Sequence, residues 1–178
     1  RTGTQSVGVD VTGLLQRLSL PVGLGFGLFI GLGAMSAWST ALRAINWTPF
    51  GIADPVFGRD VGYYVFLLPA IATGLGLLTA LLTIALMILI PVYYLRGDII
   101  LRPRMVRIEP SAGIHLAILV ASLFVLTAVR LWLVEIPGLL YATTGPMVGA
   151  SFTDLKAKLP AIRVSTVVAL GAAIAVVV

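Results

Sequence analysis

The chain consists of long apolar runs separated by short connections that are rich in polar residues, Gly and Pro. A helix needs about 20 apolar residues to cross the core of a bilayer. The runs of that length lie at residues 18–40, 68–95, 113–134 and 159–178. They do not alternate with the period of two that is typical of a half-buried strand. The pattern therefore predicts an all-α fold, a polytopic transmembrane helical bundle with about four spans.

The composition supports this fold class. Of the 178 residues, 59% are hydrophobic and 11% are charged, whereas a soluble domain carries about 25% charged residues. A mean hydropathy of +1.07 leaves too few polar side chains to cover a water-soluble surface. We therefore expect an integral membrane protein in which residues 1–178 form one transmembrane region.

The ends and the cysteine count add two expectations. The sequence begins at Arg1 without Met, and its last apolar run reaches Val178 without a polar flank. We therefore expect an internal piece of a longer chain. Cysteine is absent, which excludes disulfides, thiolate catalysis and Cys-ligated metal centres within these residues.

The connection at residues 96–112 holds the densest basic cluster of the chain. Its arginines are Arg96, Arg102, Arg104 and Arg107. Short basic loops favour the cytoplasmic side, so residues 41–67 and 135–158 are predicted to be outer loops. Anionic lipid explains the arginines and the net charge of +5 better than nucleic acid does. The stretch IILRPRMVRIEP, at residues 99–110, is predicted to form a short interfacial hairpin or strand pair.

The first outer loop contains the stretch PFGIADPVFGRDVGYYVFLLP, at residues 49–69. Its Gly and Pro residues predict turns, and its aromatic residues are typical of the headgroup region. Asp54, Arg59 and Asp60 are predicted to form a local network of ion pairs and turns. The alternative is a cation or ligand site in which Asp54 and Asp60 supply hard oxygen ligands.

The first apolar run carries small residues at helical spacing. Gly23, Gly27 and Gly31 are four residues apart, so they share one face of a helix and favour close packing against another helix. A dinucleotide-binding loop is the alternative for a glycine-rich run. The pattern G-x-G-x-x-G is not met here, and no strand precedes the run.

Ionisable residues within the runs are few. Arg130 lies near the end of the third run, and we expect it to snorkel or to pair with Asp60, Glu135 or Asp154. A role in conduction is the alternative. The single histidine, His115, is expected to be an interfacial polar residue.

The second outer loop contains a helix-capping pattern. Ser151 and Asp154 have the S-x-x-D spacing of a capping box. No base accompanies Ser151 and no G-x-S-x-G elbow surrounds it, so capping is favoured over nucleophilic catalysis. We predict no catalytic residue, metal site or cofactor in this chain.

Two stretches resemble the signatures of an uncharacterised family of large bacterial integral membrane proteins. The first is similar to FG-x-x-DP-x-FG-x-D-x-x-(F/Y)-Y-x-F-x-LP, and the matching residues are Phe50, Gly51, Asp54, Pro55, Phe57, Gly58, Asp60, Tyr64, Phe66, Leu68 and Pro69. The second stretch, residues 139–161, resembles LLYS-x-x-G-x-x-x-GASYTD-x-x-A-x-LPA. The residues that follow Trp132 are less polar than the family pattern.

The resemblance implies a topology and no activity. Family members look like chains several times longer, with about seven spans and a large extracytoplasmic part, and this chain would cover the third to sixth spans. It implies the bacterial cytoplasmic (inner) membrane, with both signature loops facing outward. The expected partners are the lipid bilayer, the rest of the same chain and other membrane proteins.

We expect a structural function, as an anchor or scaffold for an extracytoplasmic domain or an envelope assembly. One alternative is a transporter or channel component, for which other spans would have to supply the polar path. A second alternative is a membrane enzyme that acts on lipid or envelope substrates at the outer face.

Overall fold

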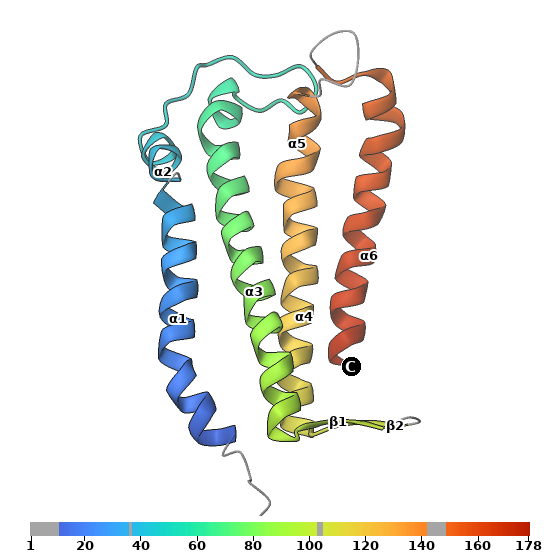
Figure 1. The fold of residues 1–178 in the computed structure, drawn as a ribbon. Helices are drawn as coiled ribbons and strands as arrows, with labels where there is room; N and C mark the ends of the chain where they lie inside the picture. The colour runs from blue at the N-terminus through green and yellow to red at the C-terminus, as the bar shows by residue number, and fades with distance from the viewer. Residues whose placement is uncertain (1–10, 36, 103–104, 142–148) are drawn as a thin grey trace, which may run out of the picture.

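A computed structural model describes residues 11–35, 37–102, 105–141 and 149–178. The predicted fold class is confirmed, because the chain is an all-α bundle of long helices that lie side by side (Figure 1). The helices are α1 (Val11–Met35), α2 (Trp38–Ile45), α3 (Leu68–Arg96), α4 (Pro110–Arg130), α5 (Ile136–Gly138) and α6 (Leu159–Val177). The strands β1 (Ile99–Arg102) and β2 (Met105–Ile108) form an antiparallel hairpin between α3 and α4.

Short helical turns of other types extend the long helices at one end of the bundle. The π turns η1 (Tyr63–Leu67) and η4 (Asp154–Lys158) precede α3 and α6, and η2 (Leu131–Glu135) follows α4. A 3-10 turn, η3 (Leu139–Tyr141), follows α5. We call this end, with residues 46–62 and 149–153, the loop end.

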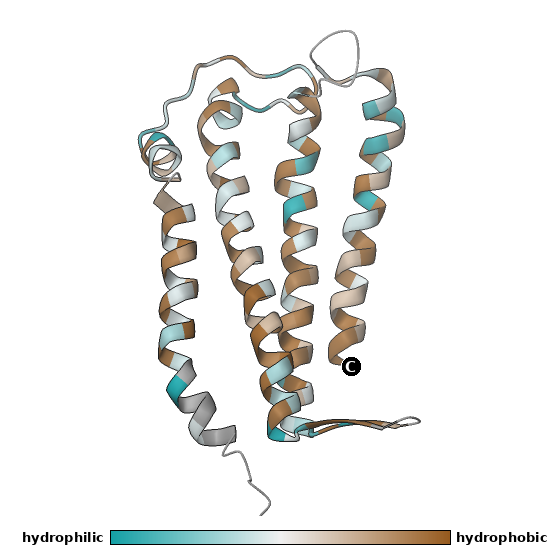
Figure 2. Cartoon of the chain, in the orientation of Figure 1, coloured by the Kyte–Doolittle hydropathy of each residue, from teal (hydrophilic) through white to brown (hydrophobic). Residues whose placement is uncertain are grey.

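Within the described residues, three continuous helices are long and apolar enough to cross a membrane. They run over Tyr63–Arg96, Pro110–Tyr141 and Asp154–Val177, with 34, 32 and 24 residues. The two longest extend beyond the runs at residues 68–95 and 113–134 because the π turns and α5 continue them into the signature stretches. Hydrophobic residues occur along the length of each of these helices (Figure 2).

The first apolar run differs from the straight helix that its length predicts. The axes of Ser19–Met35 and Trp38–Ile45 differ by 53°, and the two helices together are long and apolar enough to form one bent span. α2 reads WSTALRAI and has Arg43 in its last turn. Its polar residues make it less apolar than α1.

The tightest packing lies between α4 and α6, and α3 covers α4 from the other side (Figure 1). The buried residues at these contacts are small: Ala112, Ala121 and Ala128 on α4, and Thr166, Ala169 and Ala173 on α6. Small side chains let two helix backbones approach closely, which is the usual solution for helices in lipid. α1 packs on α3 less extensively.

Gly97 ends α3 and starts the hairpin. Its φ of 82° is left-handed, and its N–H bonds the carbonyls of Tyr93 and Tyr94, a glycine cap that leaves the helix without a Cβ clash. Asp98 then bonds back to Tyr93, and its carbonyl accepts the N–H of Glu109. The hairpin is thereby held to the ends of α3 and α4 that lie opposite the loop end (Figure 1).

Candidate functional site at the loop end

Asp54 is the hub of the first signature loop. Its carboxylate accepts the backbone N–H groups of Val56 at 2.8 Å, Phe57 at 2.6 Å and Arg59 at 2.9 Å. The hydroxyl of Tyr64, on the first turn of the long helix, donates to the same carboxylate at 2.7 Å. One side chain therefore closes the turn and ties it to the helix that follows.

Asp60 organises the other half of the same loop. Its carboxylate accepts the N–H groups of Phe50 at 3.0 Å, Gly51 at 2.8 Å and Gly62 at 2.7 Å. An antiparallel bridge joins Ala53 and Asp60. The two aspartates thus fold residues 50–62 through backbone donors, which is the local role that Asp takes in turns.

The prediction that Arg59 forms ion pairs with these aspartates is wrong. The guanidinium of Arg59 lies over the ring of Tyr63, 4.5 Å from its centroid. Within the part of the chain that the structure describes, the ion pairs are Arg96–Asp98, Arg130–Glu135 and Lys158–Asp154. Backbone N–H groups satisfy Asp54 and Asp60, so the arginine is left to form a cation–π contact.

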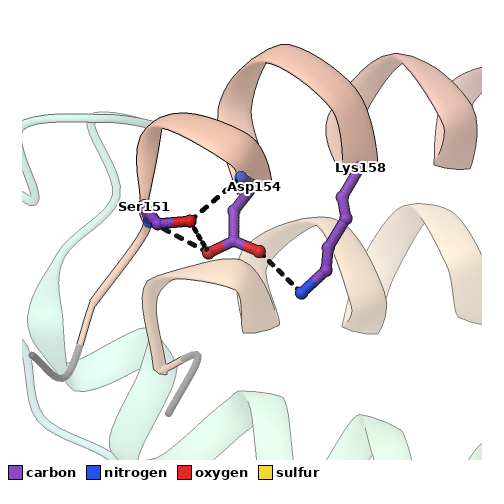
Figure 3. A network of polar contacts seen from close by, with 3 residues as sticks. All are labelled: Ser151, Asp154 and Lys158. Atoms are coloured by element: carbon purple, nitrogen blue, oxygen red, sulfur yellow. Dashed lines mark hydrogen bonds and ion pairs between the residues drawn. The ribbon is translucent and has the colours of Figure 1, made fainter. Parts of the chain in front are cut away.

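Ser151 and Asp154 form the reciprocal pair of a capping box (Figure 3). The Asp154 carboxylate accepts the N–H of Ser151 at 2.9 Å and its hydroxyl at 2.7 Å, and Ser151 Oγ accepts the N–H of Asp154 at 3.2 Å. Lys158 Nζ lies 2.6 Å from the other carboxylate oxygen. Asp154 is 1% exposed, so its charge is buried only because both oxygens have partners.

The two signature stretches meet through aromatic residues. The rings of Tyr64 and Tyr141 lie 5.7 Å apart, and the hydroxyl of Tyr63 donates to the carbonyl of Leu133 at 3.2 Å. An open cavity of about 760 Å³ lies beside this contact. Its polar lining residues are Tyr64, Glu135, Tyr141 and Lys158, and the rest of its wall is mainly apolar.

The other candidate residues lie outside the two signature stretches, although Glu135, the partner of Arg130, lines the cavity at the loop end. Arg130 Nε is 3.3 Å from Glu135 Oε1, and both side chains are about half exposed. The hydroxyl of Tyr93 is hydrogen-bonded to Nδ1 of His115 at 2.6 Å, far from the loop end. A Cβ placed on Gly23, Gly27 or Gly31 would have no atom of the described residues within 4 Å, so the packing role of these glycines stays a prediction.

The sequence predicts a turn at Gly62, but it does not predict the close contact that requires glycine at this position. A Cβ at this position would lie 2.7 Å from the carbonyl oxygen of Thr48 and 2.9 Å from Asp60 Oδ1. The backbone of residues 48–49 thus passes directly over the start of the helix. The only signal in the sequence was a glycine two residues after Asp60, which by itself does not show which strand of the loop crosses it.

The hydrogen bonds lower the pKa of both aspartates in the first loop. Burial by itself raises the pKa of the Asp54 carboxyl. The four hydrogen bonds that this carboxylate accepts have a larger combined effect in the opposite direction, so its pKa lies below the ordinary value. The donors are Phe57, Tyr64, Arg59 and Val56. The N–H of Phe50 contributes most to lowering the pKa of Asp60, and further backbone donors outweigh the effect of burial.

These shifts predict an acid-sensitive loop. Because the folded-state pKa values lie below those of the unfolded chain, the ionised carboxylates stabilise the loop above the ordinary Asp pKa of about 3.9. That stability is lost as the pH falls through the folded values. We expect the 13Cγ signals of Asp54 and Asp60 to titrate below those of an unfolded Asp peptide, measured by NMR in detergent. Titration at or above the peptide value would contradict the hydrogen-bonding pattern.

The arrangement is suited to holding a shape. Among the described residues, no group of three or more His, Cys, Asp or Glu side chains is placed to hold a metal ion. The carboxylate oxygens of Asp54 and Asp60 accept hydrogen bonds from residues 50–64. The fold and the site together define a class: an apolar helical bundle with helices of membrane-spanning length and an internally cross-linked loop end.

Comparisons with known proteins give the family. The model of an uncharacterised protein family, UPF0182, matches residues 3–178. The chain is 36% identical over 157 residues to a UPF0182 protein of Leifsonia xyli subsp. xyli, covering 87% of this chain and 16% of the relative. It is 38% identical over 149 residues to one of Cupriavidus necator, covering 84% of this chain and 16% of the relative. The chain belongs to the UPF0182 family.

The family membership sets the scale of the protein without assigning an activity. The chain spans about one sixth of the length of these curated relatives. No solved structure matches the chain.

Proposed function

We propose that this bundle is a membrane anchor that supports, at its loop end, an extracytoplasmic part of the same protein or a subunit of an envelope assembly. In this proposal the bundle lies in the cytoplasmic membrane of a bacterium, with the loop end facing outward and the hairpin facing the cytoplasm. The proposal rests on the apolar helices of membrane-spanning length and on the family's bacterial members.

The observation that carries the proposal is that the carboxylates at the loop end are hydrogen-bonded by groups of the loop end itself. Asp54, Asp60 and Asp154 receive donors from within their own loops. Tyr64 joins the first loop to Tyr141, which ends the helix Pro110–Tyr141. A loop that a ligand must order usually leaves polar groups without partners, whereas a support surface benefits from being rigid before it binds.

The two alternative functions are less well supported by the contacts. A conduction role for Arg130 would benefit from an unpaired charge facing a polar path, but Arg130 is paired with Glu135 and does not line the cavity at the loop end. An outer-face enzyme that used Ser151 would need a base at its hydroxyl. The group that accepts from this hydroxyl is the Asp154 carboxylate, but its charge is already held by Lys158 and by the N–H of Ser151 in the helix cap, which makes it a weak base.

The anchor hypothesis assigns a docking role to α1. Gly23, Gly27 and Gly31 share one face of this helix, and a Cβ at any of them would enter open space in the described structure. We propose that a span of the longer protein, or of a partner, packs against this face in the membrane.

Replacing Gly27 with Leu tests this assembly. In the full-length protein, we expect G27L to weaken helix association by roughly 1–3 kcal/mol, the usual cost of overpacking, which lowers the association constant by roughly 5- to 150-fold. Association is measured by co-purification and size-exclusion chromatography in mild detergent. Gly25→Leu is the matched control, because Gly25 is equally open and two residues away places it on nearly the opposite face. Equal behaviour of the two variants would refute the docking role.

A further inference from the structure

The β1–β2 hairpin projects sideways from the bundle. In Figure 1 it leaves the ends of α3 and α4 and lies across the direction of the helix axes. The paired residues are Ile99 with Ile108, Ile100 with Arg107, Leu101 with Val106, and Arg102 with Met105. Directly paired residues lie on the same face of an antiparallel ribbon, and successive residues alternate between its faces.

This register sorts the hairpin into two different faces. One face, which we call the apolar face, consists of Ile99, Leu101, Val106 and Ile108. The other holds Ile100, Met105 and Arg107, and we call it the basic face. A two-stranded ribbon is marginally stable on its own in water, so a ribbon with one wholly apolar face requires a surface to cover it.

No helix of the described chain covers the apolar face toward its tip. Leu101 is 62% exposed and Val106 is 63% exposed. Leucine and valine side chains that are exposed side by side on a projecting ribbon are unfavourable in water. They are favourable where the ribbon lies on the boundary between lipid headgroups and acyl chains.

One contact shows which way the apolar face points. A Cβ placed on Gly113, in the first turn of α4, would lie 3.6 Å from Cγ2 of Ile108. Since α4 runs from the hairpin toward the loop end (Figure 1), the face that holds Ile108 is the one turned toward the helices. In a bilayer crossed by α3 and α4, that direction is the acyl-chain side.

The arginines are placed to face away from the acyl chains, toward the headgroups. Arg107 is exposed and belongs to the basic face, and Arg96 at the end of α3 is 60% exposed. Arginine binds phosphate with a planar, bidentate geometry, and basic side chains near a membrane surface are attracted to anionic lipid. Arg104 lies outside the described residues.

We infer that the hairpin is a lateral membrane-surface element: its apolar face lies against the acyl chains of an anionic bilayer, and Arg107 on the basic face binds lipid phosphate groups. The inference commits to lipid as the occupant because the apolar face continues the apolar surface of α3 and α4 at the level where those helices end. It rests on the proposed placement of the helices in a membrane.

Site-directed spin labelling tests the alternation. The 178 residues contain no cysteine, so a single Cys carries the label in this region of the full-length protein, with any cysteine elsewhere replaced. The labels are placed at Leu101 and Val106 on the apolar face, and at Ile100 and Met105 on the basic face. The protein is reconstituted in nanodiscs of phosphatidylglycerol, and collisions with oxygen and with a water-soluble nickel chelate are measured for each label.

We expect the apolar-face labels to favour oxygen over the chelate by at least threefold relative to the basic-face labels. Chelate access that is equal at all four positions would overturn the inference, because the hairpin would then extend into water. Exclusion of both reagents at Leu101 and Val106 would also overturn it, because a protein surface would then cover the apolar face.

Two further measurements distinguish failure of the hairpin inference from failure of the proposed membrane placement. A label at Leu81, which is exposed in the middle of α3, reports whether the helix itself lies in lipid. If it does while the hairpin labels show no alternation, the hairpin inference fails and the membrane placement stands. We also expect Arg107→Gln, or nanodiscs of phosphatidylcholine, to reduce the oxygen preference at Leu101. An unchanged preference in both cases would refute the role of Arg107 in phosphate binding.

Discussion

Asp54→Ala is expected to release the first signature loop from the start of the long helix that contains α3. The substitution removes four hydrogen bonds at once, three from backbone N–H groups and one from the Tyr64 hydroxyl. A hydrogen bond to a charged group contributes about 1.5–3 kcal/mol. Because the contributions are not additive and the carboxylate is only half-buried, we expect a loss of about 3 kcal/mol in the free energy of unfolding.

The measurement is unfolding of the detergent-solubilised protein by SDS titration, together with limited proteolysis of residues 46–62. Asp98→Ala is the matched control, because the described side-chain partner of Asp98 is Arg96, at 3.4 Å in a surface ion pair that typically contributes less than about 1 kcal/mol. Similar losses for the two variants would contradict the role of Asp54 as the hub of the loop.

Gly62→Ala is expected to destabilise the same loop by a different mechanism. Its new Cβ would lie 2.7 Å from the Thr48 carbonyl oxygen and 2.9 Å from Asp60 Oδ1. Neither atom is at the end of a long flexible side chain, so the crossing of the chain at residues 48–49 has to open. Overpacking of this kind costs about 1–3 kcal/mol, and we expect the Asp60 hydrogen bonds to weaken with it.

Gly76→Ala provides the comparison for this substitution. Gly76 lies within α3, and a Cβ there would have no atom of the described residues within 4 Å. The change in free energy of unfolding should be near zero or favourable for G76A, since Ala has a higher helix propensity than Gly. SDS unfolding of the two variants under the same conditions decides the matter: a G62A protein as stable as G76A would show that the crossing is not tight.

The fold class was predictable because membrane helices impose a length on the sequence. Runs of about 20 apolar residues leave few other structures, and Pro110 at the start of α4 suits a first helical turn. The 53° angle between Ser19–Met35 and Trp38–Ile45 was not predictable, because no Pro lies between the two helices in the sequence to indicate it.

The candidate site was predictable where the contacts are local. The spacing of Ser151 and Asp154 indicates the capping box, since its two partners are three residues apart. The partner of Arg59 was predicted wrongly because charge suggested an aspartate, whereas the loop places backbone N–H groups at both aspartates first. The contact between Tyr64 and Tyr141 joins residues that are distant in sequence, so no local pattern indicates it.

The π turns give the bundle two independent side-chain registers. A π turn is an α-helix with one additional residue inserted, and one residue corresponds to about 100° of rotation around the axis. The turns at Tyr63–Leu67, Leu131–Glu135 and Asp154–Lys158 all lie at the loop end. In each of these helices the loop-end residues are therefore rotated about the axis relative to the residues of the apolar segment. A single-residue insertion or deletion at a π turn would change the direction of the loop-end side chains and leave the contacts among α3, α4 and α6 unchanged.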